Sequence, residues 1–247
     1  EELHGGGRIR EEDGTGSLLE GGPVTFRSAL AGIAGRLEDH QRTTLQHASV
    51  LGSGWRAPAL HSLNPGLSEE EIDAALHALV KAGWLVRIGM PPEAVYVFTN
   101  RVVQAILHDD LPDAMQNELH TRAGEYYYAL SLSGRKLRTR QAVDQYMLAH
   151  QPARALANVE LALLYARQQP TTAPGVPQPV AGLYHEALRI AASDPSLAEK
   201  RAELGMAFGD MYARVEDYAR AAQLYAEASP GGRLALPLTK LGLALLA

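Results

Sequence analysis

Apolar residues recur with helical spacing over most of this chain. Leu30, Ile33 and Leu37, for example, stand at i, i+3 and i+7, which places their side chains on one face of a helix. The same spacing predicts a series of helices, at about residues 27–38, 40–51, 57–63, 68–83, 101–108, 112–132, 139–150, 152–168, 180–192, 197–214, 218–228 and 236–247. The pattern therefore predicts a mainly α fold.

One part of the pattern is different, because residues 84–88 and 94–98 are rich in β-prone residues and flank a turn of Gly and Pro. Two such runs around a short turn are typical of a β-hairpin. The helix before them begins at Ser68, with Glu71 three positions later, which is the sequence of a capping box. Three helices followed by a hairpin is the order of a winged helix, and we predict a winged-helix-like domain over residues 26–110.

Residues 1–25 have a composition of their own, with many glycines and charged residues. We expect an irregular or flexible lead-in there, either a linker or the tail of an upstream domain. The chain does not begin with Met, and its last apolar pattern stops at Ala247 without a cap. Both ends are expected to be boundaries of a fragment.

Composition narrows the functional classes. Of 247 residues, 46 % are hydrophobic and 21 % are charged, and no cysteine occurs, so a disulfide framework and a thiolate metal site are excluded. The net charge of −5 speaks against nucleic acid as the partner. No apolar run is long enough for a membrane span, and the start lacks the features of a signal peptide. We therefore expect no membrane contact and a cytoplasmic location.

The strongest motif alternates small and large residues over two helices near the end of the chain. It consists of Phe208, Gly209, Tyr212, Tyr218, Ala221, Tyr225 and Ala228. The spacing resembles the tetratricopeptide repeat, in which small residues let two antiparallel helices approach and large residues fill the space between them. Tyr184 and Ala187 repeat part of the motif upstream, whereas Glu216 stands where the family usually has Gly. An ordinary antiparallel helical bundle is the alternative to a repeat array over residues 111–247.

The first half of the chain carries a second resemblance, which rests on the order of several apolar motifs. The positions concerned are Leu30, Leu37, Leu45, Ala48, Leu51 and Gly52, then Leu76, Leu79, Val80, Ala82 and Gly83, then Tyr96 and Phe98, then Leu119, His120 and Ala123. Together they resemble the region after the nucleotide-binding domain of large bacterial signal-transduction ATPases (the STAND, AAA-type class), as fused to class III adenylate or guanylate cyclases or found in LuxR-type activators. The resemblance implies a winged-helix-like domain followed by tetratricopeptide-like repeats. Asn100 departs from the family, which usually has His there.

No catalytic constellation emerges from the sequence. A Gly-x4-Gly-Lys-Ser/Thr run for binding phosphates does not occur, and the nine histidines show no metal-ligand spacing. We therefore expect this chain not to be an enzyme and to hold no cofactor or metal, while ATPase or cyclase activity would belong to the parent protein that the resemblance implies.

Two clusters are candidates for contact with a partner. Tyr126 and Tyr127 belong to a run of three tyrosines, a residue type favoured both in cores and in interfaces. A basic cluster follows, with the candidate partner-binding residues Arg135, Lys136, Arg138 and Arg140. It suits an acidic partner, a phosphate or nucleic acid, although such clusters are more often solvated loops.

The expected function is a non-catalytic scaffold for protein interaction and signal relay. Its partner would be a protein, a peptide or another domain of the parent protein. The alternative is a fragment of a transcriptional regulator that contacts DNA through the winged helix. The recognition helix begins with Glu69, Glu70 and Glu71, and residues 68–100 hold five acidic against two basic residues. Such a surface repels phosphate, which disfavours the DNA alternative.

Overall fold

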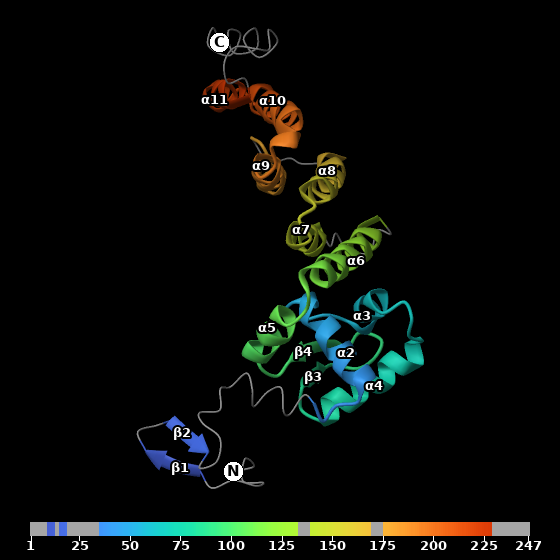
Figure 1. Ribbon diagram of the computed structural model, residues 1–247. Coiled ribbons are helices and arrows are strands. Elements are labelled where there is room, and N and C mark those ends of the chain that lie inside the picture. Colours follow the sequence, from blue (N-terminus) through green and yellow to red (C-terminus); the bar gives the residue numbers. More distant parts are fainter. Residues whose placement is uncertain (1–8, 13–14, 19–34, 133–138, 169–174, 229–247) are drawn as a thin grey trace. The chain divides into compact units, whose positions relative to one another are not determined.

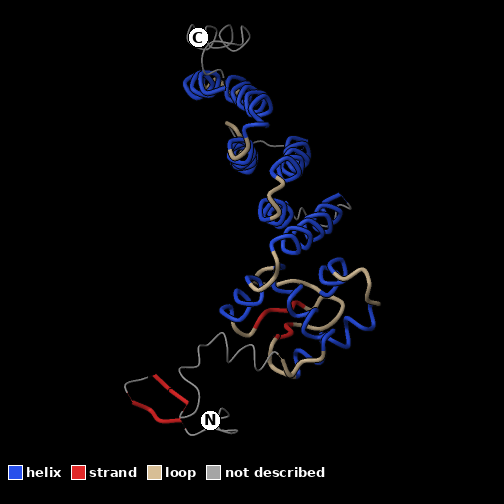
Figure 2. Tube along the Cα trace, viewed as in Figure 1, coloured by secondary structure: helices blue, strands red, loops and turns tan. Residues whose placement is uncertain are grey.

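The computed structural model describes residues 9–12, 15–18, 35–132, 139–168 and 175–228. The fold is mainly helical, as predicted, and the described residues also form two small antiparallel sheets (Figures 1 and 2). Contacts between Cα atoms divide the chain into two compact units, with the division between Gln116 and Asn117. We call these the first and the second unit and describe each by itself.

The first unit contains the predicted sequence of helices and hairpin. Its elements are α2 (Asp39–Ala48), the 3-10 helix η1 (Ser49–Leu51), α3 (Ala57–Leu63), α4 (Glu69–Lys81), β3 (Leu85–Ile88), β4 (Val95–Phe98) and α5 (Arg101–Asp109). The core lies between α2, α3 and α4, where Leu45, Leu60 and Leu79 are fully buried. Each such leucine contributes roughly 1.5–3 kcal/mol through the removal of its side chain from water.

The start of α4 has the predicted capping box. The Ser68 hydroxyl accepts from the backbone N–H of Glu71 at 3.2 Å, and the Glu71 carboxylate accepts from the backbone N–H of Ser68 at 2.7 Å. The two bonds satisfy N–H groups that have no partner inside the helix. The same bonds hold the pKa of Glu71 below its ordinary value.

The hairpin pairs Leu85 with Phe98 and Ile88 with Val95. Trp55, in the loop before α3, forms a bridge to β4, with its backbone N–H 3.1 Å from the Tyr96 carbonyl oxygen. The Trp55 and Tyr96 rings stack with centroids 5.3 Å apart. The loop is thereby joined to the strand that covers the helical core.

The prediction of an irregular lead-in is wrong for part of residues 1–25. Strands β1 (Ile9–Glu12) and β2 (Thr15–Leu18) form a short antiparallel pair, with Glu12 opposite Thr15. The sequence between them is Asp13-Gly14, a typical two-residue hairpin connection. The high glycine content concealed this local turn sequence. The helix predicted at 27–38 lies mostly outside the described residues.

The second unit begins at Asn117, in the second turn of α6, and its described part is a succession of helices. They are α6 (Asp113–Leu132), α7 (Thr139–Leu148), α8 (Pro152–Gln168), α9 (Gln178–Ala192), the 3-10 helix η2 (Pro195–Leu197), α10 (Ala198–Arg214) and α11 (Tyr218–Ala228). From α7 to α11, each helix packs against the next along the chain, as Figure 1 shows. The helix predicted at 236–247 lies outside the described residues. Among the helices described, none combines the length and the apolar character needed to cross a bilayer.

Candidate protein-interaction surface

The last two described helices approach closely at a glycine. A Cβ atom added to Gly209 on α10 would lie 2.5 Å from Cε1 and 2.7 Å from Cδ1 of Tyr225 on α11. One turn away, a Cβ on Gly205 would lie 3.0 Å from Cβ of Ala228. The Tyr225 ring therefore lies directly on the backbone of α10, and any side chain at position 209 would displace it.

Tyr225 is also held at its far end. Its hydroxyl donates to Oδ1 of Asp210 at 2.7 Å, and the ring is only 3 % exposed. Burial and this hydrogen bond raise the pKa of the Tyr225 hydroxyl above its ordinary range. The ring is thus anchored both by packing and by a polar contact on the helix that it covers.

An aromatic cluster connects this pair of helices to the preceding one. Phe208 is fully buried, and its ring stacks on Tyr184 of α9 at 4.6 Å between centroids and 6° between planes. Tyr212 lies against the other rings at 5.1 Å from Phe208. Burial raises the pKa of Tyr184, which is 1 % exposed. The aromatic residues of the motif therefore fill the space between successive helical pairs.

The contact between glycine and tyrosine occurs a second time, between α6 and α7. A Cβ on Gly124 would lie 2.7 Å from Cδ1 of Tyr146. Beside it, Nδ1 of His120 lies 2.7 Å from Oε1 of Gln145, both residues being buried. The sequence does not mark this contact, because the stretch between Gly124 and Tyr146 is longer than that between Gly209 and Tyr225.

The turns after α7 and α10 have the same geometry. His150 and Glu216 adopt left-handed conformations, with φ of 55° and 63°. In each turn, the N–H of the following residue bonds back to a tyrosine carbonyl, Gln151 to Tyr146 at 2.8 Å and Asp217 to Tyr212 at 3.0 Å. This is the Schellman arrangement, in which glycine is the usual left-handed residue. Glu216 occupies the position at which the tetratricopeptide motif usually has Gly, and its backbone adopts the left-handed conformation that glycine favours.

A groove of about 260 Å³ lies between α8, α9 and α10. Its apolar lining includes Leu163, Leu204 and Leu164, and the Leu164 side chain is 54 % exposed. Ligand sites are commonly concave, with an apolar lining and a few polar groups. We call this concave surface of the described second unit the α8–α10 groove.

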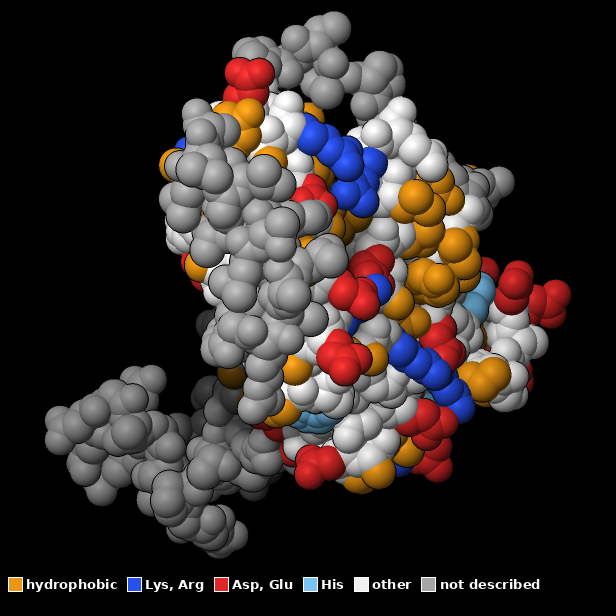
Figure 3. All heavy atoms as spheres, turned by 90° about the horizontal axis from the view of Figure 1, so that it is seen from above, with side chains coloured by type: hydrophobic (Ala, Val, Ile, Leu, Met, Phe, Trp, Pro, Cys, Tyr) orange, Lys and Arg blue, Asp and Glu red, His pale blue; other side chains and the backbone are white. Residues whose placement is uncertain are grey.

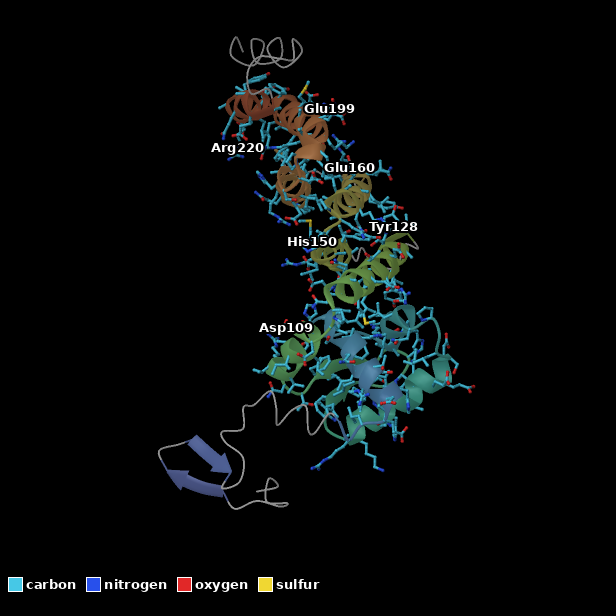
Figure 4. The ribbon with its side chains drawn as sticks, viewed as in Figure 1. Asp109, Tyr128, His150, Glu160, Glu199 and Arg220 are labelled. Carbon is cyan, nitrogen blue, oxygen red and sulfur yellow. The ribbon has the colours of Figure 1, made fainter. Side chains whose placement is uncertain are left out.

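Charged side chains line the α8–α10 groove beside the leucines. Nζ of Lys200 lies 2.9 Å from Glu160 and 3.2 Å from Glu203, and these hydrogen bonds raise the pKa of Lys200 (Figure 4 labels Glu160 on α8). The Arg167 guanidinium stands 5.5 Å from the centre of the Tyr184 ring. The space-filling view also shows apolar side chains grouped between charged ones on the molecular surface (Figure 3). The groove can thus contact both apolar and polar groups of a ligand.

The predicted repeat-packing residues are placed as follows. Those that are buried are Phe208, Gly209, Tyr212, Ala221, Tyr225, Ala228, Tyr184 and Ala187. Tyr218, the first residue of α11, is half-buried. They thus contribute chiefly to the packing between helices.

The candidate partner-binding residues lie elsewhere. Tyr127 is buried and meets the half-buried Tyr126 edge-to-face at 5.2 Å. Arg140 is exposed, 3.8 Å from Asp144, whereas Arg135, Lys136 and Arg138 lie outside the described residues. None of these residues lines the α8–α10 groove.

The groove residues were missed in the sequence because no local motif marks them. They come from three helices, and the whole of α9 lies between Glu160 and Lys200 in the sequence. In the described part of the chain, no cluster of three or more His, Asp or Glu side chains is arranged to hold a metal. Comparison of the chain with protein-family models, with curated proteins and with solved structures gave no match.

Proposed function

We propose that this chain is a non-catalytic scaffold that binds a protein or peptide partner in the α8–α10 groove. The observation that carries the proposal is the groove itself, in which the exposed Leu164 stands beside Glu160 and Lys200. A half-exposed leucine in a concave surface loses contact with water when a partner covers it, and this contributes to binding.

The array around the groove is proposed to be of the tetratricopeptide type. Two contacts of the same kind support this proposal, because Gly124 lies against the Tyr146 ring as Gly209 lies against the Tyr225 ring. Glu216 and His150 supply the same left-handed turn after one helix of each pair. Stacked repeats present a continuous surface to a ligand. The resemblance to bacterial signal-transduction ATPases suggests signal relay, with the first unit as a winged-helix-like module between an ATPase and the array.

The test uses the whole chain and two matched variants. Leu164→Glu places a charge in the groove, whereas Ile88→Glu places one on the hairpin of the first unit. The two side chains are equally exposed, at 54 % and 57 %. Each variant is immobilised and exposed to cell lysate, and the proteins retained are identified by mass spectrometry. Both variants should fold, as circular dichroism would show.

A partner that is retained by the wild type and by Ile88→Glu but lost with Leu164→Glu is the expected result. Equal retention by both variants, or loss with Ile88→Glu alone, would show that the groove is not the binding surface. A DNA mobility shift that weakens steeply with salt would instead favour the regulator fragment that contacts DNA.

A further inference from the structure

A second and larger groove lies in the first unit, between α3, α4 and the β3–β4 hairpin. Its volume is about 580 Å³, within the usual range of sites for small molecules. The floor is apolar, formed by Leu76 and Val80 of α4 and by Ala94 and Tyr96 from the hairpin side. Pro91, in the turn between the strands, closes one side. We call this the α4–hairpin groove.

Two cationic side chains line the groove. Lys81 is the last residue of α4, Arg87 lies in β3, and both side chains line the groove. Neither forms an ion pair with any described residue, and the nearby carboxylate of Glu93 is already paired with Arg56. Two unpaired cations beside an apolar floor are suited to the negative group of a ligand.

Another part of the lining is acidic and polar. Asp73 lies near the start of α4, and its carboxylate is 3.7 Å from Nε2 of His61. Nε2 of His61 is buried and has no hydrogen-bond partner in the described structure. Asp73 and Lys81 are eight positions apart on one helix, which corresponds to roughly 12 Å along its axis. The lining therefore combines two cations, an apolar floor and, roughly 12 Å from Lys81 along α4, a carboxylate that can accept hydrogen bonds.

We propose that the α4–hairpin groove binds a small organic anion with an apolar body, such as an aromatic or aliphatic carboxylate. The carboxylate would contact Lys81 and Arg87, and the apolar body would lie on Val80 and Tyr96. A hydroxyl or amine about 12 Å away along α4 would reach the exposed carboxylate of Asp73. The volume of the groove and its length of about 12 Å along α4 suit a small molecule rather than a folded domain.

The proposal is independent of the proposed protein-binding function, because its residues all belong to the first unit. It also differs from a DNA contact, since it needs only two cations and an apolar surface.

The probe is 4-phenylbutyrate, with 4-phenylbutanamide as its neutral counterpart. Binding to the whole chain is followed by tryptophan emission, because Tyr96 in the groove stacks on Trp55. Ligand-observed NMR provides a second readout. We expect a dissociation constant below about 1 mM for the carboxylate, the range of a ligand of this size, and binding at least about tenfold weaker for the amide.

Charge variants locate the site. Lys81→Gln and Arg87→Gln should each weaken binding of the carboxylate severalfold and leave binding of the amide unchanged. Arg101→Gln removes an exposed cation on α5 outside the groove and should bind as the wild type does. All three positions are exposed, so the variants should fold, and far-UV circular dichroism checks this.

Three outcomes would overturn the proposal. Equal affinity for carboxylate and amide would remove the role of the cations. An equal loss of affinity for the carboxylate in Arg101→Gln would show non-specific charge attraction. Binding of a capped acidic peptide, acetyl-Asp-Leu-Phe-amide, more than tenfold tighter than phenylbutyrate would make the occupant a protein segment.

Discussion

Replacing Gly209 by alanine would add one methyl group at the closest contact between α10 and α11. The added Cβ would lie 2.5 Å from Cε1 of Tyr225, where no real Cβ atom is found. The ring cannot retreat easily, because its hydroxyl is bonded to Asp210 and it is almost fully buried. Gly182, on the exposed side of α9, is the matched control, since nothing lies within 4 Å of an added Cβ there.

The two substitutions should have opposite signs. Alanine in a helix interior is favoured over glycine by about 1 kcal/mol, and Gly182→Ala should show up to this gain. At Gly209 the same gain is opposed by overpacking, which costs about 3 kcal/mol in a site that cannot relax. We therefore expect Gly209→Ala to lower the free energy of unfolding by about 2 kcal/mol.

The assay separates the two units. Both tryptophans of the chain, Trp55 and Trp84, belong to the first unit, so their emission reports its unfolding alone. Urea unfolding followed by circular dichroism at 222 nm reports helices of both units. Gly209→Ala should shift the circular dichroism transition to lower urea and leave the tryptophan transition in place.

A stabilising effect of Gly209→Ala equal to that of Gly182→Ala would refute the close contact. A shift of the tryptophan transition would show that the substitution does not act within the second unit alone. Gly124→Ala offers an independent repetition, because its added Cβ would lie 2.7 Å from the Tyr146 ring. It should be destabilising for the same reason.

Three further substitutions test separate parts of the structure. Glu216→Gly should stabilise the second unit by up to about 1 kcal/mol, because φ at this position is 63° and glycine adopts this conformation without strain. An unchanged or lower midpoint in urea unfolding would argue against the left-handed turn. Asn158→Leu should stabilise the second unit by about 1–2 kcal/mol, because both amide atoms are buried and have no hydrogen-bond partner among the described residues. A loss of stability in the same assay would mean that water or another group satisfies them. Ser68→Ala should lower the tryptophan-monitored stability of the first unit by about 1 kcal/mol. The backbone N–H of Ser68, and to a smaller extent its hydroxyl, lower the pKa of Glu71 in the folded chain. This contribution to stability is present above the unfolded pKa and is lost as the pH falls through the folded one. Because Ser68→Ala removes the part due to the hydroxyl, its deficit should shrink in acid; a constant deficit would contradict this.

Much of the local structure could be predicted from the sequence. The bounds of α3, α8 and α11 follow from apolar spacing and from turn residues, and the Ser68–Glu71 box marks the start of α4. These features depend on neighbouring residues, whose interactions are decided within one or two helical turns. The short pair of strands near the start was missed, although the Asp13-Gly14 sequence is equally local.

Tertiary structure was needed for the contacts between helices. Gly124 and Tyr146 have the small and large character of Gly209 and Tyr225, yet the longer stretch between them hides the correspondence. The predicted tyrosines and arginines also gave no indication of the α8–α10 groove.

The sequence by itself determined the helices, the hairpin and the residues that could pack closely. It did not determine which surfaces would become grooves. Lys200 meets Glu160 because α8 and α10 both pack against α9, which lies between them in the sequence. Likewise, Lys81 and Arg87 share one groove because β3 folds back beside α4. Such sites arise only when distant segments pack, since the free energy that places them comes from burial of the core rather than from the groove residues themselves.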